Sequence, residues 1–395
     1  MIEQHNNWEQ RLSPAVNAVA PSGIRKFFDI AAQMEDVISL GVGEPDFVTP
    51  WSIRESCMYG LEQGYTSYTA NRGMPELREE IVQHYARRFG NTYEAATDVL
   101  VTVGVSEALD IAMRAVLSPG DEVLIPEPCY VSYQACTILA GGIPVAVPAK
   151  LENEFRITPE ELEEHVTEKT KVLLIGYPNN PTGAIMTRED LLKVADFAEK
   201  HDLIVISDEI YGDLTYGDEE HVCFSSLPNM QERTILLNGF SKAYAMTGWR
   251  IGYALGNKAI IAAMTKIHQY TMLCAPITAQ VAAIEALRHG EKYMKKMVSE
   301  YDRRRRLIYD GLTKLGLSCF EPKGAFYIFP DITNTGYNSN DFAEKLLQAE
   351  HVALVPGSAF GACGEGHVRC SYATSIDKIS EALNRIENFL KNHRR

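Results

Sequence analysis

The strongest constraint on the fold of this 395-residue chain is an alternation of short aliphatic runs with helical patterns in its middle part. The runs are rich in Val, Leu and Ile and lie at residues 99–103, 122–126, 145–147, 171–176, 203–207 and 234–238. Between them, residues 106–117 and 188–201 carry apolar side chains at helical spacing. Strands that are apolar on both faces are typical of parallel sheets covered by helices. The pattern therefore predicts an α/β fold with a mostly parallel sheet flanked by helices.

The sequence also suggests how the chain divides into domains. After about residue 285, a long charged helix at 291–315 precedes short apolar runs at 325–329 and 352–355. We expect residues 286–395 to form a smaller α+β domain and residues 48–285 to form the large one. The first 47 residues are too few to bury a core alone, so we expect them to pack with the small domain.

Composition and charge exclude several classes of protein. A net charge of −14 argues against nucleic-acid or anionic-lipid partners, because phosphate binding needs clustered Lys and Arg. We expect no membrane span and no secretory signal, since no sufficiently long apolar run is present. The eight cysteines form no C-x-x-C pair, which favours reduced thiols in the cytoplasm. The histidines do not cluster, so no metal site is expected.

Four polar segments each follow a predicted strand, at residues 104–109, 177–183, 207–211 and 238–250. In open α/β sheets, ligands bind at the carboxyl ends of the strands. We therefore expect these segments to meet at one edge of the sheet and to form the functional site.

Two of these segments carry residues suited to pyridoxal 5′-phosphate (PLP). Asp208 ends an aliphatic run, where an unpaired carboxylate would be costly, and a protonated pyridine nitrogen would be a suitable partner. The alternative is a helix cap. Lys242 lies in a Gly/Ser turn beside aromatic residues, where partial desolvation would help it to lose its proton and form a Schiff base. The alternative is an ordinary surface lysine.

The other candidate residues could bind phosphate and polar oxygens. Arg250 offers a planar fork for phosphate. Backbone N–H groups at the start of the helix near Ser106 form a natural phosphate cradle, although no P-loop motif is present. The Asn180 amide can both donate and accept hydrogen bonds, and the alternative is a rigid Pro/Gly turn.

Taken together, these motifs resemble the class I/II aminotransferases of PLP fold type I. The segment from Ser241 to Gly252 resembles the lysine signature of the aspartate and aromatic aminotransferases. Residues 41–47, 178–183 and 207–211 match further motifs in the family's order, and 368–372 resembles its carboxylate-binding arginine motif. The resemblance extends from about residue 21 to residue 390.

The resemblance implies a role for each matching residue toward the cofactor. Lys242 would hold PLP as a Schiff base and shuttle a proton between Cα and C4′, while Asp208 would pair with the pyridinium nitrogen. Asn180 and Tyr211 would bind the phenolic oxygen, and Tyr130 would stack on the ring. The remaining cofactor contacts would come from Gly104, Val105, Ser106, Ser241, Arg250 and, across a homodimer interface, Tyr68 of the neighbouring subunit.

The resemblance also implies the substrate site and the reaction. Arg369 would clamp the substrate α-carboxylate, helped by Gly43 and Asn180, with Ile24 nearby. The expected reaction moves an amino group between an L-amino acid and a 2-oxo acid by a ping-pong mechanism, with 2-oxoglutarate and glutamate as one pair. One departure is Gly239, where many relatives carry Ser or Thr as a phosphate ligand.

Two other functions stay open at this stage. The same residues would serve a PLP-dependent C–S β-lyase or a related PLP enzyme of the same fold. A non-catalytic protein that senses PLP or amino acids is the alternative from another class. The amino donor also stays open, because the motifs are shared by alanine, aromatic and N-acetyl-diaminopimelate aminotransferases.

Overall fold

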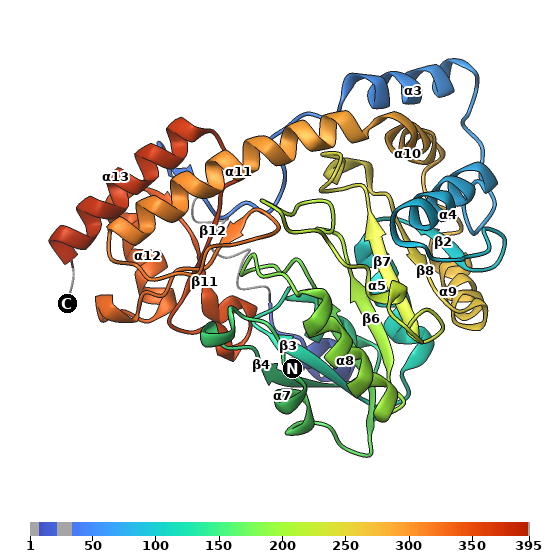
Figure 1. The fold of residues 1–395 in the computed structure, drawn as a ribbon, viewed down its shortest axis with the longest axis horizontal. Coiled ribbons are helices and arrows are strands. Elements are labelled where there is room, and N and C mark those ends of the chain that lie inside the picture. Colours follow the sequence, from blue (N-terminus) through green and yellow to red (C-terminus); the bar gives the residue numbers. More distant parts are fainter. Residues whose placement is uncertain (1–7, 22–33, 394–395) are drawn as a thin grey trace, which may run out of the picture.

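The computed structural model describes residues 8–21 and 34–393. Its centre is a seven-stranded sheet in the order β2-β8-β7-β6-β5-β3-β4 (Figure 1). The strands from β7 to β4 in this order are parallel, whereas β8 is antiparallel to both of its neighbours. The predicted α/β fold with a mostly parallel sheet is therefore confirmed. The strand bounds are Val99–Thr102 (β2), Glu122–Glu127 (β3), Ile143–Pro148 (β4), Thr170–Gly176 (β5), Ile204–Asp208 (β6), Thr234–Gly239 (β7) and Gly252–Leu255 (β8).

Strand β8 was not among the predicted strands, and it decides where Arg250 lies. Its first residue, Gly252, is paired with Thr102 at the end of β2 and with Gly239 at the end of β7. Since β8 runs antiparallel, its amino end lies at the same edge as the carboxyl ends of the parallel strands. Arg250 thereby reaches the edge of the sheet where the other candidate residues collect.

Helices cover both faces of the sheet, and alternate residues of β2 show this directly. Leu100 packs in a core with residues of α5 and α9, whereas Val99 and Val101 pack with residues of α3, α4 and α10. Further along the sheet, α8 covers the face that carries Leu173 and Val205. The helices are Trp51–Glu62 (α3), Pro75–Phe89 (α4), Val105–Val116 (α5), Ser132–Leu139 (α6), Pro159–Glu163 (α7), Arg188–Lys200 (α8), Lys258–Thr271 (α9) and Ile277–His289 (α10).

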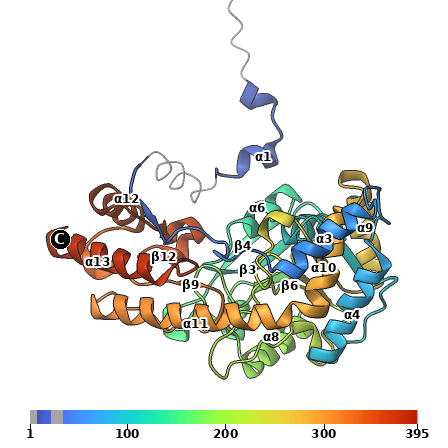
Figure 2. The same ribbon diagram turned by 90° about the horizontal axis from the view of Figure 1, so that it is seen from above.

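A long helix, α11 (Glu291–Lys314), leads from the sheet to a second, smaller core (Figures 1 and 2). This core holds α12 (Ser339–Glu350), α13 (Ile376–His393) and a small antiparallel sheet of β11 (Val355–Pro356), β12 (Val368–Ser371) and β9 (Tyr327–Ile328). Near the amino end, β1 (Ile38–Ser39) pairs with β10 (Val352–Ala353). A short helix, α1 (Pro14–Ala18), precedes β1. The limits proposed for the domains stay predictions.

Two apolar runs of the small domain are less regular than the sequence predicts. In the run 325–329, Ala325 has a φ of 56°, and only Tyr327 and Ile328 belong to a strand. The run 352–355 is divided between two sheets, because its first two residues pair with β1 and Val355 pairs with β12. Within residues 8–21 and 34–393, no helix is long and apolar enough to cross a membrane.

Candidate active site

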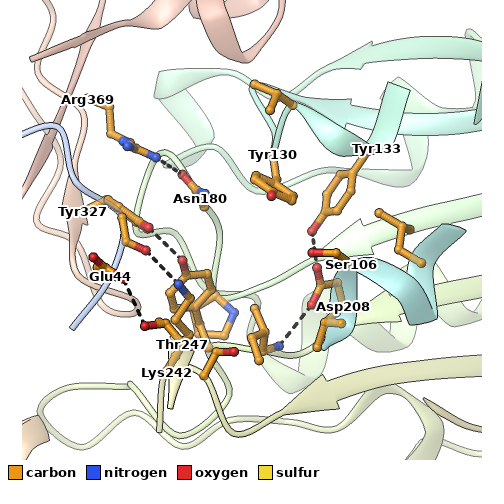
Figure 3. A pocket seen from close by; sticks show the side chains of 18 of the residues that line it. Glu44, Ser106, Tyr130, Tyr133, Asn180, Asp208, Lys242, Thr247, Tyr327 and Arg369 are labelled. Atoms are coloured by element: carbon orange, nitrogen blue, oxygen red, sulfur yellow. Dashed lines mark hydrogen bonds between the residues drawn. The ribbon is translucent and has the colours of Figure 1, made fainter. Parts of the chain in front are cut away.

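A cavity of about 580 Å³ lies at the carboxyl edge of the large sheet, where that sheet meets the small core (Figure 3). The ends of β5, β6 and β7 and the start of α5 form one wall, and residues of the amino-terminal segment and of β12 form the other. The predicted convergence at this edge therefore exists in the structure. The side chains used below that line the cavity are Gly43, Glu44, Val105, Ser106, Tyr130, Tyr133, Asn180, Asp208, Tyr211, Ser241, Lys242, Thr247, Arg250, Tyr327 and Arg369.

Asp208, the last residue of β6, is a buried carboxylate whose hydrogen bonds come from uncharged groups. The Tyr133 hydroxyl donates to Oδ2 at 2.9 Å, and the Ile210 backbone N–H donates to Oδ1 at 3.2 Å. Burial raises the pKa of Asp208 to about 6, although both hydrogen bonds oppose this shift. A cation bound beside this carboxylate would favour its ionised form.

Lys242 projects its amine into the cavity from the turn that follows β7. Its Nζ donates to the Gly43 carbonyl oxygen at 2.7 Å and lies 5.7 Å from the centre of the Tyr211 ring. Burial lowers the pKa of Lys242 to about 8, and the nearby charge of Glu44 opposes this shift. A larger fraction of this amine is therefore uncharged near neutral pH than for an exposed lysine.

The turn between β2 and α5 presents hydrogen-bond donors beside Arg250. Gly104 precedes α5 with a φ of 77°, and no side chain caps the helix start. A Cβ at Gly104 would lie 2.8 Å from an Arg250 guanidinium nitrogen, so only glycine permits this approach. Ser106 adds its hydroxyl to the cavity wall. Free N–H groups at a helix start, a hydroxyl and a guanidinium together suit a phosphate group.

Arg369, on β12, lies buried on the side of the cavity opposite Asp208 (Figure 3). Its two terminal nitrogens donate to Asn180 Oδ1 at 2.9 Å and to the Gly41 carbonyl oxygen at 2.5 Å. Its Nε has no hydrogen-bond partner within the part of the chain that the structure describes. The guanidinium carbon also lies 4.5 Å from the centre of the Tyr327 ring. A buried guanidinium held only by neutral oxygens is well suited to an incoming carboxylate.

Two tyrosines of the site were missed from the sequence. Tyr133 binds Asp208, and the Tyr327 hydroxyl lies 2.8 Å from that of Tyr211. Tyr327 also limits the space at Gly43, where a Cβ would lie 2.7 Å from its hydroxyl oxygen. In the sequence, Tyr133 looks like a residue of a helix and Tyr327 like a residue of a strand. The sequence could have indicated them only through their proximity to another predicted site residue, as Tyr133 lies three positions after Tyr130.

The structure brings most of the predicted residues together, with three exceptions. Gly104 adjoins the cavity through Arg250 rather than lining it. Tyr68 is 83% exposed and lies outside the cavity of its own chain. Ile24 lies outside the described residues. At Gly239, a Cβ would lie 2.9 Å from the Gly252 Cα and 3.2 Å from Val105, so a larger residue would disturb the start of α5.

The charges of the cavity fit PLP together with a substrate carboxylate. The hydrogen bonds that the structure gives to Lys242, Arg250 and Arg369 all end on uncharged oxygens. Asp208 is likewise held by uncharged donors. Phosphate, a protonated ring nitrogen, an aldehyde and a carboxylate would satisfy Arg250, Asp208, Lys242 and Arg369 in turn. The fold and this donor set define a PLP-dependent enzyme.

Comparison with known proteins identifies the family. The family described as "Aminotransferase class I and II" matches residues 35–386, and the chain belongs to it. The chain is 55% identical to the "Putative aminotransferase YugH" of Bacillus subtilis (strain 168), covering 96% of this chain and 98% of that protein. It is 49% identical to an aspartate aminotransferase of Pyrococcus abyssi, with the same coverage.

Solved structures agree with this assignment. The aromatic aminotransferase from Pyrococcus horikoshii superposes with a TM-score of 0.89 at 46% identity, covering 93% of this chain and 98% of that one. Members of the family use pyridoxal 5′-phosphate. The protein is therefore a PLP-dependent aminotransferase, as the sequence predicted.

Proposed function

We propose that this aminotransferase moves an amino group between an L-amino acid and a 2-oxo acid by a ping-pong mechanism, with Lys242 as the covalent anchor of PLP. One observation carries this proposal. A buried amine with a lowered pKa lies in a cavity that has a carboxylate on one side and a guanidinium on the other, and the hydrogen bonds that the structure gives to both end on uncharged groups. When bound, PLP delocalises the electrons released as the Cα–H bond of the substrate breaks.

Asp208 and Tyr133 lie at the end of the cavity where the ring nitrogen of PLP would bind. The ionised carboxylate holds a proton on that nitrogen, which strengthens electron withdrawal. The Tyr133 hydroxyl fixes the orientation of the carboxylate through its 2.9 Å hydrogen bond to Oδ2. We propose that Asp208 is the catalytic carboxylate and that Tyr133 positions it.

Lys242 is proposed as the group that moves the proton. Its Nζ takes the proton from the substrate Cα when it is uncharged and returns a proton later in the reaction. A pKa near 8 suits both steps at neutral pH, because proton transfer is most efficient when the pKa of the group lies near the working pH.

Arg369, Asn180 and Gly43 are proposed to bind the substrate carboxylate. The two hydrogen bonds of the Arg369 guanidinium to neutral oxygens fix its plane in advance. A carboxylate bound to a fixed guanidinium cannot rotate freely, so the Cα–H bond is held in one direction. This orientation favours cleavage of that bond over the other bonds at Cα.

The remaining cofactor contacts are proposed from residues that line the cavity and from Gly104, which adjoins it. Arg250 and the start of α5 would hold the phosphate, with Gly104, Val105 and Ser106 supplying backbone donors and a hydroxyl. Tyr130 would stack on the ring, Tyr211 and Asn180 would bind the phenolic oxygen, and Ser241 would add a contact beside the lysine.

We further propose a homodimer in which Tyr68 reaches the phosphate of the neighbouring subunit. Tyr68 is 83% exposed, and Tyr65, Tyr59 and Met58, which lie close to it in the sequence, are exposed apolar side chains as well. Exposed apolar patches of this kind often mark protein interfaces. All eight cysteines are free thiols, which supports our proposal that the enzyme works in the cytoplasm.

For the substrates, we propose 2-oxoglutarate and glutamate as one pair. The relatives' names differ on the other pair, since one is an aspartate and another an aromatic aminotransferase. The cavity is lined by Tyr130, Tyr211 and Tyr327. Whether it accepts amino acids with aromatic side chains can therefore be tested directly. The experiment below also distinguishes transamination from the reactions of a lyase and from the inactivity of a sensor.

A panel of amino donors, scored for 2-oxo acid with and without 2-oxoglutarate, tests the reaction. We expect 2-oxo acid only when the acceptor is present, with an equal amount of glutamate. Release of ammonia without an acceptor would indicate a lyase, and no turnover with any donor would indicate a sensor. In parallel, Lys242→Ala should lose the covalent bond to PLP that borohydride reduces. Lys171→Ala should keep it, because Lys171 lies near the start of β5 and pairs with Asp121.

A further inference from the structure

Behind the turn that precedes α5 lies a buried pair of side chains that the proposed reaction does not use. His268 of α9 is fully buried, and its Nδ1 lies 2.5 Å from Glu107 Oε1. Glu107 is only 9% exposed. The other ring nitrogen of His268 has no hydrogen-bond partner within the part of the chain that the structure describes. Burying a carboxylate and an imidazole is costly, so a purely structural role would be met better by apolar side chains.

The second oxygen of Glu107 holds the turn itself. The Val103 backbone N–H donates to Glu107 Oε2 at 2.6 Å. Gly104 is the cap residue of α5 and Glu107 is its third helical residue, so the carboxylate folds back across the turn. This contact resembles one half of a capping box, shifted by one residue, because Gly104 has no side chain with which to form the other half. It closes residues 103–107, which we call the phosphate turn, into a ring.

The two sides of the phosphate turn therefore have different surroundings. Ser106 faces the cavity, whereas Glu107 lies between α5 and α9. Arg250 approaches the turn at Gly104, and its hydrogen bond runs to the Thr247 carbonyl oxygen. The direction of the N–H groups at the start of α5 thus depends on Glu107, and the position of Glu107 depends on His268.

We infer that Glu107 and His268 are positioning residues that hold the N–H groups of the phosphate turn toward the cofactor phosphate. The inference rests on the proposed phosphate site. It predicts that changing either residue weakens the affinity for ligands that carry a phosphate group and not for ligands that lack it. Mutation of residues that orient metal ligands typically costs ten- to a hundredfold in affinity or activity. By analogy we expect an effect at the lower end of this range, because Arg250 remains.

The chain contains a matched control pair. His221 Nε2 lies 2.6 Å from Glu209 Oε2, both side chains are buried, and Glu209 also accepts a backbone N–H, that of Phe224. This pair has the same chemistry as Glu107–His268 but does not contact the phosphate turn. His221→Phe is therefore the control for His268→Phe.

The experiment compares two ligands, PLP and pyridoxal, which lacks the phosphate. Each is titrated into the full-length apoenzyme, and the dissociation constants are taken from absorbance. In Glu107→Gln and His268→Phe we expect the dissociation constant for PLP to rise about tenfold. The dissociation constant for pyridoxal should stay within about twofold of the parent value. His221→Phe should not weaken PLP relative to pyridoxal. Because its partner Glu209 directly follows Asp208, any change that it causes should be equal for the two ligands, which share the ring. Glu107→Asp, which keeps the charge but shortens the reach, should behave like Glu107→Gln and gives a second variant if one folds poorly.

The possible outcomes separate this inference from the proposed function. Equal weakening of both ligands, or no weakening of PLP, would overturn the positioning role. Arg250→Ala should also weaken PLP relative to pyridoxal. If it does not, the phosphate site itself is wrongly assigned, and the inference fails with it.

Discussion

Replacing Arg369 by lysine tests the carboxylate site without removing its positive charge. The Arg369 guanidinium is 3% exposed and already oriented by Asn180 and the Gly41 carbonyl. A carboxylate can form two parallel hydrogen bonds with it, but only one with a lysine amine. A hydrogen bond to a charged group contributes about 1.5–3 kcal/mol. Loss of one should therefore raise the dissociation constant of the amino acid roughly 10- to 150-fold.

The assay is titration of the PLP-loaded enzyme with amino acid, followed by absorbance before turnover. Binding of PLP should change less than about twofold, because Arg369 lies on the opposite side of the cavity from the phosphate turn. The control is Arg305→Lys, which changes another buried arginine, on α11, that pairs with Asp302 and Glu321. It should leave amino-acid affinity unchanged. If Arg369→Lys binds the amino acid within twofold of the parent enzyme, Arg369 is not the clamp.

Three further predictions concern the proton, the apoprotein and the dimer. Since burial lowers the pKa of Lys242 to about 8, capture of PLP by the apoenzyme should accelerate with pH and level off above a midpoint near 8, as followed by stopped-flow absorbance. A midpoint near 10 would contradict the burial argument. The folded-state pKa of Asp208 is raised from 3.8 to about 6, so ionising it in the apoprotein costs stability as pH rises through this window. Asp208→Asn should therefore raise the melting temperature of the apoprotein at pH 8, by an amount worth up to about 3 kcal/mol, and should lose this advantage near pH 4. An equal effect at both pH values would show that the carboxylate is not strained by burial. Finally, if Tyr68 completes the neighbouring site, mixing Lys242→Ala and Tyr68→Ala subunits at limiting PLP should recover roughly a quarter of the parent activity, because half of the dimers carry one intact site. An inactive mixture would place Tyr68 in its own subunit's site, and a Tyr68→Ala enzyme that is fully active without mixing would place it in neither site.

The sequence predicts the parts of the fold that follow from the hydrophobic pattern, namely most of the large sheet. It predicts β8 and the small sheet less well. The six predicted strands of the large sheet are present. Five of them are largely buried, and their aliphatic composition shows it, whereas the edge strand β4 buries only Val147. Strand β8 was missed because its sequence, Gly-Tyr-Ala-Leu, is short and follows directly on the lysine motif. The small sheet was harder still, since the positive φ of Ala325 shortens one strand and two sheets share the run 352–355.

The candidate site shows the same division. Lys242, Asp208 and Arg369 were found because each belongs to a motif with a recognisable spacing. Tyr133 and Glu107 were not found, because they act through other residues and look like ordinary members of a helix. The Glu107–His268 contact joins residues 161 positions apart, and nothing in the local sequence signals it.

The cavity contains three cationic side chains, those of Lys242, Arg250 and Arg369, and the buried Asp208, and the hydrogen bonds of all four end on neutral groups. This arrangement affects how much of the enzyme a cell can keep. Each anion that binds there relieves electrostatic strain in the folded chain alone, so the cofactor acts as a folding ligand as well as a reagent. At a hundred times its dissociation constant, a ligand of the native state adds about 2.7 kcal/mol of stability. Vitamin B6 supply should thus set the lifetime of the protein against proteolysis, in addition to its turnover.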